Sequence, residues 1–241
     1  MKLGSKGSRE VSSLESLVRW DRPGHGLVPP DEFIPLAEQT GLIESLTDYV
    51  LHAALKQIAQ WRENGSSVAV AVNLAPQLLS DLDLPDRLSD LLAEYGVDGS
   101  ALIVEVTESA AMTDAARTMD ILTRLRLKGI ELSMDDFGTG YSSLVELYRM
   151  PFSEMKIDKS FVIDVNRDKE AEVIVRSIVD LGHNLGLKVC AEGVETEEAM
   201  SFLRSIKCDL AQGYFLSKPL PPSDMMALIE TWAWEADRDE A

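Results

Sequence analysis

Acidic side chains follow two apolar segments of the chain at spacings that suit metal-ion chemistry. Asp135 and Asp136 stand side by side after the alternating segment 130–134, and a turn with two glycines follows them. Glu105 and Glu108 follow an earlier apolar segment in a similar way. Adjacent carboxylates repel each other unless cations lie between them. Two ions that share these carboxylates would convert the repulsion into coordination.

Almost all of the remaining predicted strands also contain polar residues. Those that we single out are Glu15, Arg19, Asn73, Lys156, Asp158, Glu192, Glu195 and Gln212. An isolated Asp or Glu after a strand is usually the cap of the following helix. A polar residue toward the same end of almost every strand favours an active site instead, because barrels and open α/β sheets build their sites at the carboxyl ends of their strands.

Strand alternation indicates which of these side chains share a face. Glu105 shares its face with Ile103 and therefore suits the interior, whereas Glu108 has the other parity and suits a supporting role in the loop. Asp135 shares its face with Ser133. Carboxylates with one amide oxygen are the ligands of hard cations, so the expected ions are magnesium or manganese.

A phosphoryl group is the substrate class that such a site would serve. Two-metal sites activate water against phosphoryl centres, and Lys156 and Arg19 would supply positive charge for a phosphate. Zinc is not expected, because the three histidines have no zinc-ligand spacing: His25, His52 and His183.

The elements that must position these residues alternate between short and long apolar segments. The predicted strands cover 12–20, 68–75, 101–108, 130–136, 154–161, 187–195 and 210–217. Apolar residues at helical spacing fill most of the intervening segments, and Gly65 and Gly129 end two of them. This alternation predicts an α/β fold with a parallel sheet. Seven strands fit an open doubly wound sheet, whereas a barrel requires eight.

Composition narrows the function classes further. The chain has 241 residues and a formal net charge of -18, which disfavours binding to nucleic acid polymers and anionic membranes. No apolar run reaches the roughly 20 residues of a membrane span, and no secretory signal is visible. The two cysteines, Cys190 and Cys208, are expected to be reduced thiols of a cytoplasmic protein. We expect one domain over 12–236, after a polar leader or truncated edge at 1–11 and before an acidic tail at 237–241.

The chain resembles the EAL family of bacterial cyclic di-GMP phosphodiesterases. The name motif occurs as Glu15-Ser16-Leu17, with Ser in place of the usual Ala. Seven further blocks follow in the family's order: GLVPPDEFIPLAEQTGLI (26–43), VNLAP (72–76), EVTES (105–109), MDDFGTGYSSL (134–144), KIDKSFV (156–162), AEGVET (191–196) and AQGYFLSKPL (211–220). The resemblance implies a modified TIM-type (β/α)8 barrel with one antiparallel strand. The family's strand ahead of the name motif is expected to be truncated in this chain.

The resemblance also implies a role for each residue singled out above. The implied metal ligands are Glu15, Asn73, Glu105, Asp135 and Asp136. The implied catalytic residues are Glu192 as general base, Lys156 and Asp136. Substrate contacts are expected from Arg19 and Gln212. Supporting roles, including the anchoring of the loop after Asp136, are expected from Glu108, Asp158 and Glu195.

The function implied in this way is hydrolysis of cyclic di-GMP to the linear dinucleotide pGpG in bacterial second-messenger signalling. Two Mg²⁺ or Mn²⁺ ions per site and inhibition by Ca²⁺ are expected. A homodimer is expected through the loop after Asp136 and neighbouring helices. An upstream regulatory domain and a membrane-tethered parent protein are compatible with a cytoplasmic domain that makes no membrane contact itself.

Two alternatives stay open at this point. A degenerate family member would bind cyclic di-GMP as a receptor without turnover. A barrel enzyme outside the family would act on a carboxylate substrate, with Lys156 as its base.

Overall fold

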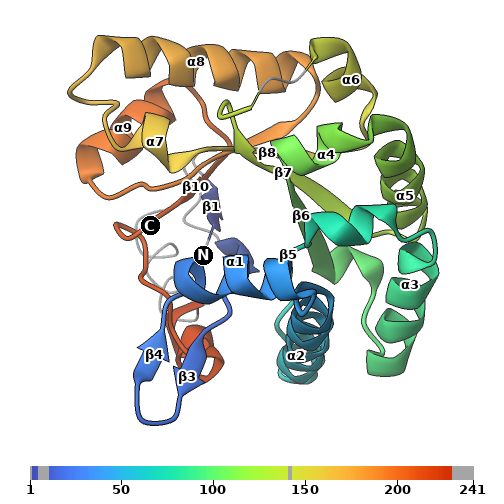
Figure 1. Ribbon diagram of the computed structural model, residues 1–241. Helices are drawn as coiled ribbons and strands as arrows, with labels where there is room; N and C mark the ends of the chain where they lie inside the picture. Colours follow the sequence, from blue (N-terminus) through green and yellow to red (C-terminus); the bar gives the residue numbers. More distant parts are fainter. Residues whose placement is uncertain (1, 5–10, 141–142, 230–241) are drawn as a thin grey trace.

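A closed barrel of eight strands forms the centre of the protein in a computed structural model, which describes residues 2–4, 11–140 and 143–229 (Figure 1). Around the barrel the strands follow the order β1-β10-β9-β8-β7-β6-β5-β2. They are β1 (Lys2–Gly4), β2 (Val11–Glu15), β5 (Ala69–Asn73), β6 (Leu102–Thr107), β7 (Glu131–Phe137), β8 (Glu154–Ile157), β9 (Lys188–Ala191) and β10 (Leu210–Gln212). A separate hairpin pairs β3 (Trp20–Arg22) with β4 (Gly26–Val28).

Helices lie around the outside of this barrel (Figure 1). The α-helices are α1 (Pro30–Thr40), α2 (Ile43–Glu63), α3 (Leu84–Tyr95), α4 (Glu108–Thr113), α5 (Ala115–Leu127), α6 (Leu144–Arg149), α7 (Lys159–Val162), α8 (Lys169–Asn184) and α9 (Glu197–Ser205). Two 3₁₀ turns cover Pro76–Ser80 and Gly99–Ala101, and residues 222–229 are helical too. The predicted alternation of strands and helices is confirmed.

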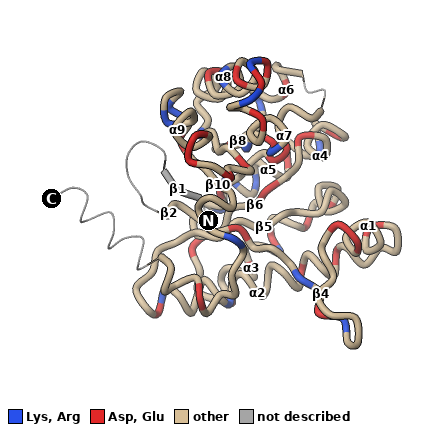
Figure 2. Tube along the Cα trace, turned by 90° about the vertical axis from the view of Figure 1, so that its left-hand side faces the viewer, with Lys and Arg blue, Asp and Glu red and all other residues tan. Residues whose placement is uncertain are grey.

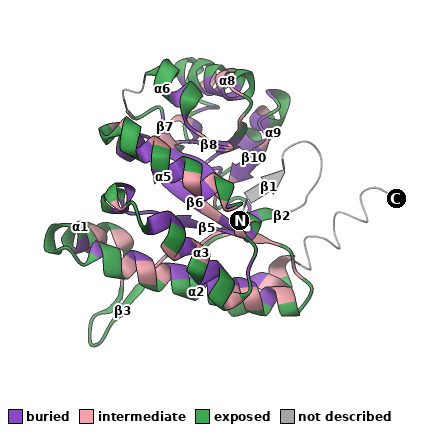
Figure 3. Cartoon of the chain, turned by 90° about the vertical axis from the view of Figure 1, so that its right-hand side faces the viewer, coloured by how far each residue is buried: buried purple, intermediate pink, exposed green. Residues whose placement is uncertain are grey.

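The helices bury one face against the strands and leave the other in solvent, as the purple strands and partly green helices of Figure 3 show. Helix α8 gives the clearest case. Gly182 lies where α8 meets β9, and a Cβ at this position would come within 2.3 Å of the Val189 Cγ2. Only a glycine lets the helix approach the barrel this closely, because it has no Cβ.

The predicted barrel class is confirmed, and so is its one antiparallel strand. Strand β1 pairs antiparallel with both of its neighbours, β10 and β2, whereas the other neighbouring strands of the barrel pair in parallel. The sequence analysis expected a polar leader or truncated edge at residues 1–11 and a truncated strand ahead of the name motif. Lys2–Gly4 is that strand, because even three residues can add a rung to the open edges of β10 and β2.

Two of the predicted strands are longer than the strands in the structure. The segment predicted as a strand over 154–161 turns into helix α7 after Ile157, and the segment predicted over 210–217 is a strand only to Gln212. The acidic tail at 237–241 lies outside the described residues, and the domain limits at 12 and 236 stay predictions.

Acidic residues predominate in the chain. Asp and Glu outnumber Lys and Arg by 41 to 23, and Figure 2 shows acidic positions on elements as distant as α1 and α8. Within the described residues, no helix is long and apolar enough to cross a membrane.

Candidate active site

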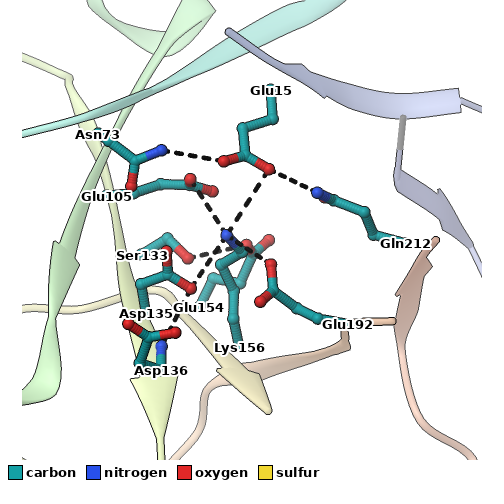
Figure 4. Close-up of polar contacts among 10 residues, drawn as sticks. All are labelled: Glu15, Asn73, Glu105, Ser133, Asp135, Asp136, Glu154, Lys156, Glu192 and Gln212. Atoms are coloured by element: carbon teal, nitrogen blue, oxygen red, sulfur yellow. Dashed lines mark hydrogen bonds and ion pairs between the residues drawn. The ribbon is translucent and has the colours of Figure 1, made fainter. Parts of the chain in front are cut away.

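The carboxyl ends of the barrel strands bring together side chains from six strands and from Glu192, which directly follows β9 (Figure 4). Parallel strands place their carboxyl ends at the same mouth of a barrel, so residues distant in sequence meet there. The predicted residues that gather in this way are Glu15, Asn73, Glu105, Asp135, Asp136, Lys156, Glu192 and Gln212.

Lys156 occupies the centre of this cluster, and only 1% of its side chain is exposed. Its Nζ lies 2.7 Å from a Glu192 oxygen, 3.0 Å from Asp135 and 3.1 Å from Glu105. A Glu15 oxygen lies 4.0 Å away. One ammonium group therefore faces several carboxylates, and negative charge remains in excess. A buried excess of this kind calls for further cations.

Amide side chains orient Glu15 from two sides. The Asn73 Nδ2 donates a hydrogen bond of 2.9 Å to Glu15 Oε1, and the Gln212 Nε2 donates to Glu15 Oε2. The Asn73 Oδ1 is then available as a neutral metal ligand. The Gln212 Oε1 is buried and has no hydrogen-bond partner among the described residues. An unsatisfied acceptor beside an acidic cluster suits a water molecule or a ligand donor.

A β-bulge explains how two adjacent aspartates can serve one site. The register between β7 and β8 shifts between Met134 and Phe137. Asp135 and Asp136 of β7 therefore lie opposite the single residue Lys156 of β8. Asp136 also adopts the left-handed conformation with φ 56°, which residues other than glycine rarely adopt. Neighbouring side chains point to opposite faces of a regular strand, and the bulge re-aims one of them.

Three carboxylates lie close enough together to bind one cation. Asp135, Asp136 and Glu192 each offer an oxygen, and these oxygens lie within 4.8 Å of one another. Oxygen ligands on opposite sides of a magnesium ion are about 4 Å apart. With Glu15, Glu105 and the Asn73 amide nearby, the donor set consists of oxygen alone, so the residues present fit Mg²⁺ or Mn²⁺.

Burial and charge shift the pKa values of the cluster. Burial raises the pKa of Glu192 to about 7; the contact with Lys156 opposes this shift and the Asp135 charge adds to it. Burial also raises the pKa of Asp136, with Asp135 and Asp158 acting in the same direction. Burial lowers the pKa of Lys156, but Glu105, Glu15 and other carboxylates outweigh it, so that this pKa lies well above its usual value. Lys156 is therefore a fixed positive charge and not a base, which argues against the carboxylate-substrate hypothesis.

A family model for the EAL domain matches residues 6–219. The chain belongs to the EAL domain family. It is 43% identical over 217 residues to the bifunctional diguanylate cyclase/cyclic di-GMP phosphodiesterase MucR of Pseudomonas aeruginosa, covering 90% of this chain and 32% of MucR. It is 42% identical over 217 residues to the oxygen sensor protein DosP of Escherichia coli, covering 90% of this chain and 27% of DosP. The EAL domain thus spans about a third or less of the length of these relatives.

Solved structures agree with this EAL assignment. The structure of the MucR phosphodiesterase in complex with c-di-GMP superimposes with a TM-score of 0.89 at 41% identity, covering 93% of this chain and 91% of that one. The EAL enzyme Bd1971 in its cAMP- and cyclic-di-GMP-bound form gives a TM-score of 0.89 at 32% identity, covering 95% of this chain and 62% of that one.

Glu108 links the EAL domain's cluster to the loop after Asp136. Its Oε2 accepts hydrogen bonds from the backbone N–H groups of Gly138, at 2.9 Å, and Gly140, at 3.3 Å. Glu108 is 3% exposed, and a Cβ on Gly140 would come within 3.0 Å of its carboxyl carbon. The buried carboxylate therefore holds the loop that begins at the bulge, in the geometry expected of an anchor.

The remaining three predicted residues lie outside the cluster. The Asp158 side chain caps α7 by accepting from the Ser160 N–H, although its charge still raises the Asp136 pKa. Glu195 is exposed and lines a different cavity of about 350 Å³. Arg19 is exposed and donates to the Val18 carbonyl, at the edge of the cavity described next.

A cavity of about 560 Å³ adjoins the cluster at Glu15 and Gln212. Arg19 lines it together with Tyr214 and Lys218, which follow β10. The sequence analysis did not single out the last two, although both lie in the AQGYFLSKPL block that it quoted. It placed Ser133 on the face of Asp135 but did not single out its buried partner Glu154, which has the same strand parity as Lys156 and could have been found by it.

Proposed function

We propose that this EAL domain is a metal-dependent phosphodiesterase that hydrolyses cyclic di-GMP to the linear dinucleotide pGpG. The observation that carries the proposal is the cluster around Lys156, whose Nζ has carboxylate oxygens of Glu15, Glu105, Asp135 and Glu192 within 4.0 Å. Such a set of oxygen ligands, with one fixed cation at its centre, suits a two-metal site for phosphoryl chemistry.

The proposed substrate is based on the names of the relatives. The name of the bifunctional MucR includes cyclic di-GMP phosphodiesterase. NbdA of Pseudomonas aeruginosa, at 41% identity over 228 residues, and PdeR of Escherichia coli, at 38% identity over 212 residues, are named cyclic di-GMP phosphodiesterases. The solved MucR domain that matches this chain is a complex with c-di-GMP.

Two groups of residues would hold the ions. Glu15, Asn73, Glu105 and Asp135 would bind one ion, and Asp135, Asp136 and Glu192 would surround a second. Ions bound there would lower the pKa of a water molecule and neutralise charge on the phosphate. Ca²⁺ should inhibit, since it takes more ligands at longer distances than the small cluster offers.

The chain's own groups would then orient the substrate and move a proton. Glu192 lies beside the proposed second ion and is suited to accept the proton of the attacking water. Lys156, charged throughout, would stabilise the negative charge that develops on the phosphate. Arg19 would contact phosphate oxygens from the cavity wall, and the free Gln212 Oε1 would accept a hydrogen bond from substrate or water. Water adds to phosphorus, one phosphate–3′-oxygen bond breaks, and the leaving oxygen takes up a proton.

The direct test is incubation of the protein with cyclic di-GMP and Mg²⁺ or Mn²⁺, followed by chromatography of the nucleotides. Appearance of pGpG supports the proposal. Tight binding without product in either metal would favour the receptor hypothesis. Glu192→Gln keeps the shape of the base and removes its charge, and it should lower the rate about 10² to 10⁴-fold while binding changes little. Turnover within threefold of the unmodified protein would show that Glu192 is not the base.

A homodimer through the loop after Asp136 and its neighbouring helices is part of the proposal. Helix α6 follows this loop and exposes Leu144, Val145 and Tyr148, of which Tyr148 is 72% exposed. Sedimentation of the unmodified protein and of Tyr148→Glu would test the interface, because a buried carboxylate should dissociate it. A cytoplasmic location and an upstream regulatory domain also stay predictions.

A further inference from the structure

A buried Ser–Glu pair lies one layer beneath the active site, toward the amino ends of β7 and β8. The Ser133 Oγ donates a hydrogen bond of 2.9 Å to Glu154 Oε1. Ser133 is 0% exposed and Glu154 is 7% exposed. Side chains two residues apart share a strand face, so Ser133 precedes Asp135 on one face of β7 and Glu154 precedes Lys156 on one face of β8; Figure 4 draws all four side chains together.

The ladder between the two strands breaks directly above this pair. Ser133 and Glu154 are register partners, and the shift that forms the bulge begins after Met134. Two residues further along each strand, the Asp135 side chain makes an ion pair with Lys156 at 3.0 Å. That contact belongs to the cluster itself, where cations would compete with Lys156 for the same carboxylate oxygens. The Ser133–Glu154 hydrogen bond therefore ties the strands together one residue pair before the register shift.

We propose that the Ser133–Glu154 pair is a positioning device that fixes the bulge, and with it the spacing of the Asp135 and Asp136 carboxylates for divalent cations. This inference rests on the proposed metal site. Loss of the Ser133 hydroxyl removes one hydrogen bond from a buried carboxylate, which is costly. Entry of water or a shift of β8 against β7 would relieve that cost. Either change moves Asp135 relative to Lys156.

The same strand pair contains a matched control. The Ser153 Oγ donates a hydrogen bond of 2.6 Å to Glu131 Oε2. Ser153 directly precedes β8 and Glu131 begins β7, so this second Ser–Glu contact lies at the amino ends of the strands, away from the bulge. Ser153→Ala also deletes a Ser–Glu contact between these two segments, but a part-buried one: Ser153 donates to the Leu132 carbonyl as well, and Glu131 pairs with Arg126.

The experiment compares Mn²⁺ binding by Ser133→Ala, Ser153→Ala and the unmodified protein. Isothermal titration of the metal-free proteins gives the dissociation constants, and thermal unfolding in EDTA gives the stabilities. Loss of a residue that orients metal ligands typically weakens affinity about 10- to 100-fold. We expect a loss of about tenfold for Ser133→Ala and less than twofold for Ser153→Ala. Equal affinities in the two variants would overturn the proposal.

A second pair of variants keeps the test valid if Ser133→Ala does not fold. Thr and Val have nearly the same shape and differ in the hydroxyl, so Ser133→Thr should bind Mn²⁺ about tenfold more tightly than Ser133→Val. Equal affinity in this pair would also refute a role for the hydroxyl. Failure of the proposed function has a different signature: the unmodified protein would bind no Mn²⁺ or release no pGpG. The first of these results would overturn both proposals, whereas missing turnover with intact metal binding would leave the positioning role standing.

Discussion

Replacement of Lys156 by Met gives the sharpest test of the charge balance in the site. Met has a similar length and no charge, so it fills much of the same space among the carboxylates. In the metal-free protein this variant leaves Glu15, Glu105, Asp135 and Glu192 without their shared ammonium group. We expect a large loss of stability in EDTA and a partial recovery when Mn²⁺ is added.

The size of the effect follows from burial. The Lys156 side chain is 1% exposed and three of its four carboxylate contacts are no longer than 3.1 Å. Removing one partner of a buried ion pair costs about 3–5 kcal/mol. For a protein of this length about 1 kcal/mol lowers Tm by about 2–4 °C, so the Tm of Lys156→Met should fall by about 10 °C. An ion that binds only the folded state restores about 2.7 kcal/mol at a concentration of 100 times its Kd.

Thermal unfolding by circular dichroism, with EDTA or with Mn²⁺, measures both effects. Lys159→Met is the matched control, because Lys159 is an exposed lysine three residues further along the chain. Its Tm should change by less than about 2 °C, as is usual for surface substitutions. If Lys156→Met and Lys159→Met had the same Tm in EDTA, the carboxylates would not depend on the Lys156 charge. The interpretation that the metal-free cluster has an excess of negative charge would then be wrong.

Three further outcomes are expected. The pKa of Glu192, about 7, lies above its usual 4.5, so the contribution of this group to stability in EDTA is lost as pH rises from about 4.5 to 7. Glu192→Gln should remove that part of the pH dependence of Tm. Gly182→Ala should lower the free energy of unfolding by about 1–3 kcal/mol in urea titrations, because the new Cβ collides with Val189; an unchanged midpoint would mean that α8 can move outward at no cost. Cys208 should resist iodoacetamide at pH 8 in the folded protein and react in urea, because burial raises its pKa to about 12; rapid alkylation of the folded protein would contradict this.

Much of the site could be predicted from the sequence because barrel geometry is simple. Parallel strands end at one mouth, so polar residues at the ends of the predicted strands were bound to meet. Strand parity also separated Glu105, which faces the cluster, from Glu108, which anchors the loop. The ordered blocks identified the family without any coordinates, and the family model confirms that identification.

Other features depend on contacts between segments that local sequence does not specify. Parity assigns Asp135 and Asp136 to opposite faces, and only the register shift against β8, with the left-handed φ of Asp136, brings both to the site. Asp158 and Glu195 were expected to support the site, and only the structure shows that one caps α7 and the other lines a separate cavity.

Desolvation is the property that the tertiary structure alone decided. Sequence identified Lys156 as a positive charge for a phosphate, but its enclosure by carboxylates from three other strands and from Glu192, which follows β9, makes it the fixed cation of the whole cluster. The same enclosure raises the pKa of Glu192 toward neutrality. Residue types and their order thus determined which groups are present, whereas the packing of the barrel determined how far water is excluded from them, and water controls the strength of every charge interaction in the site.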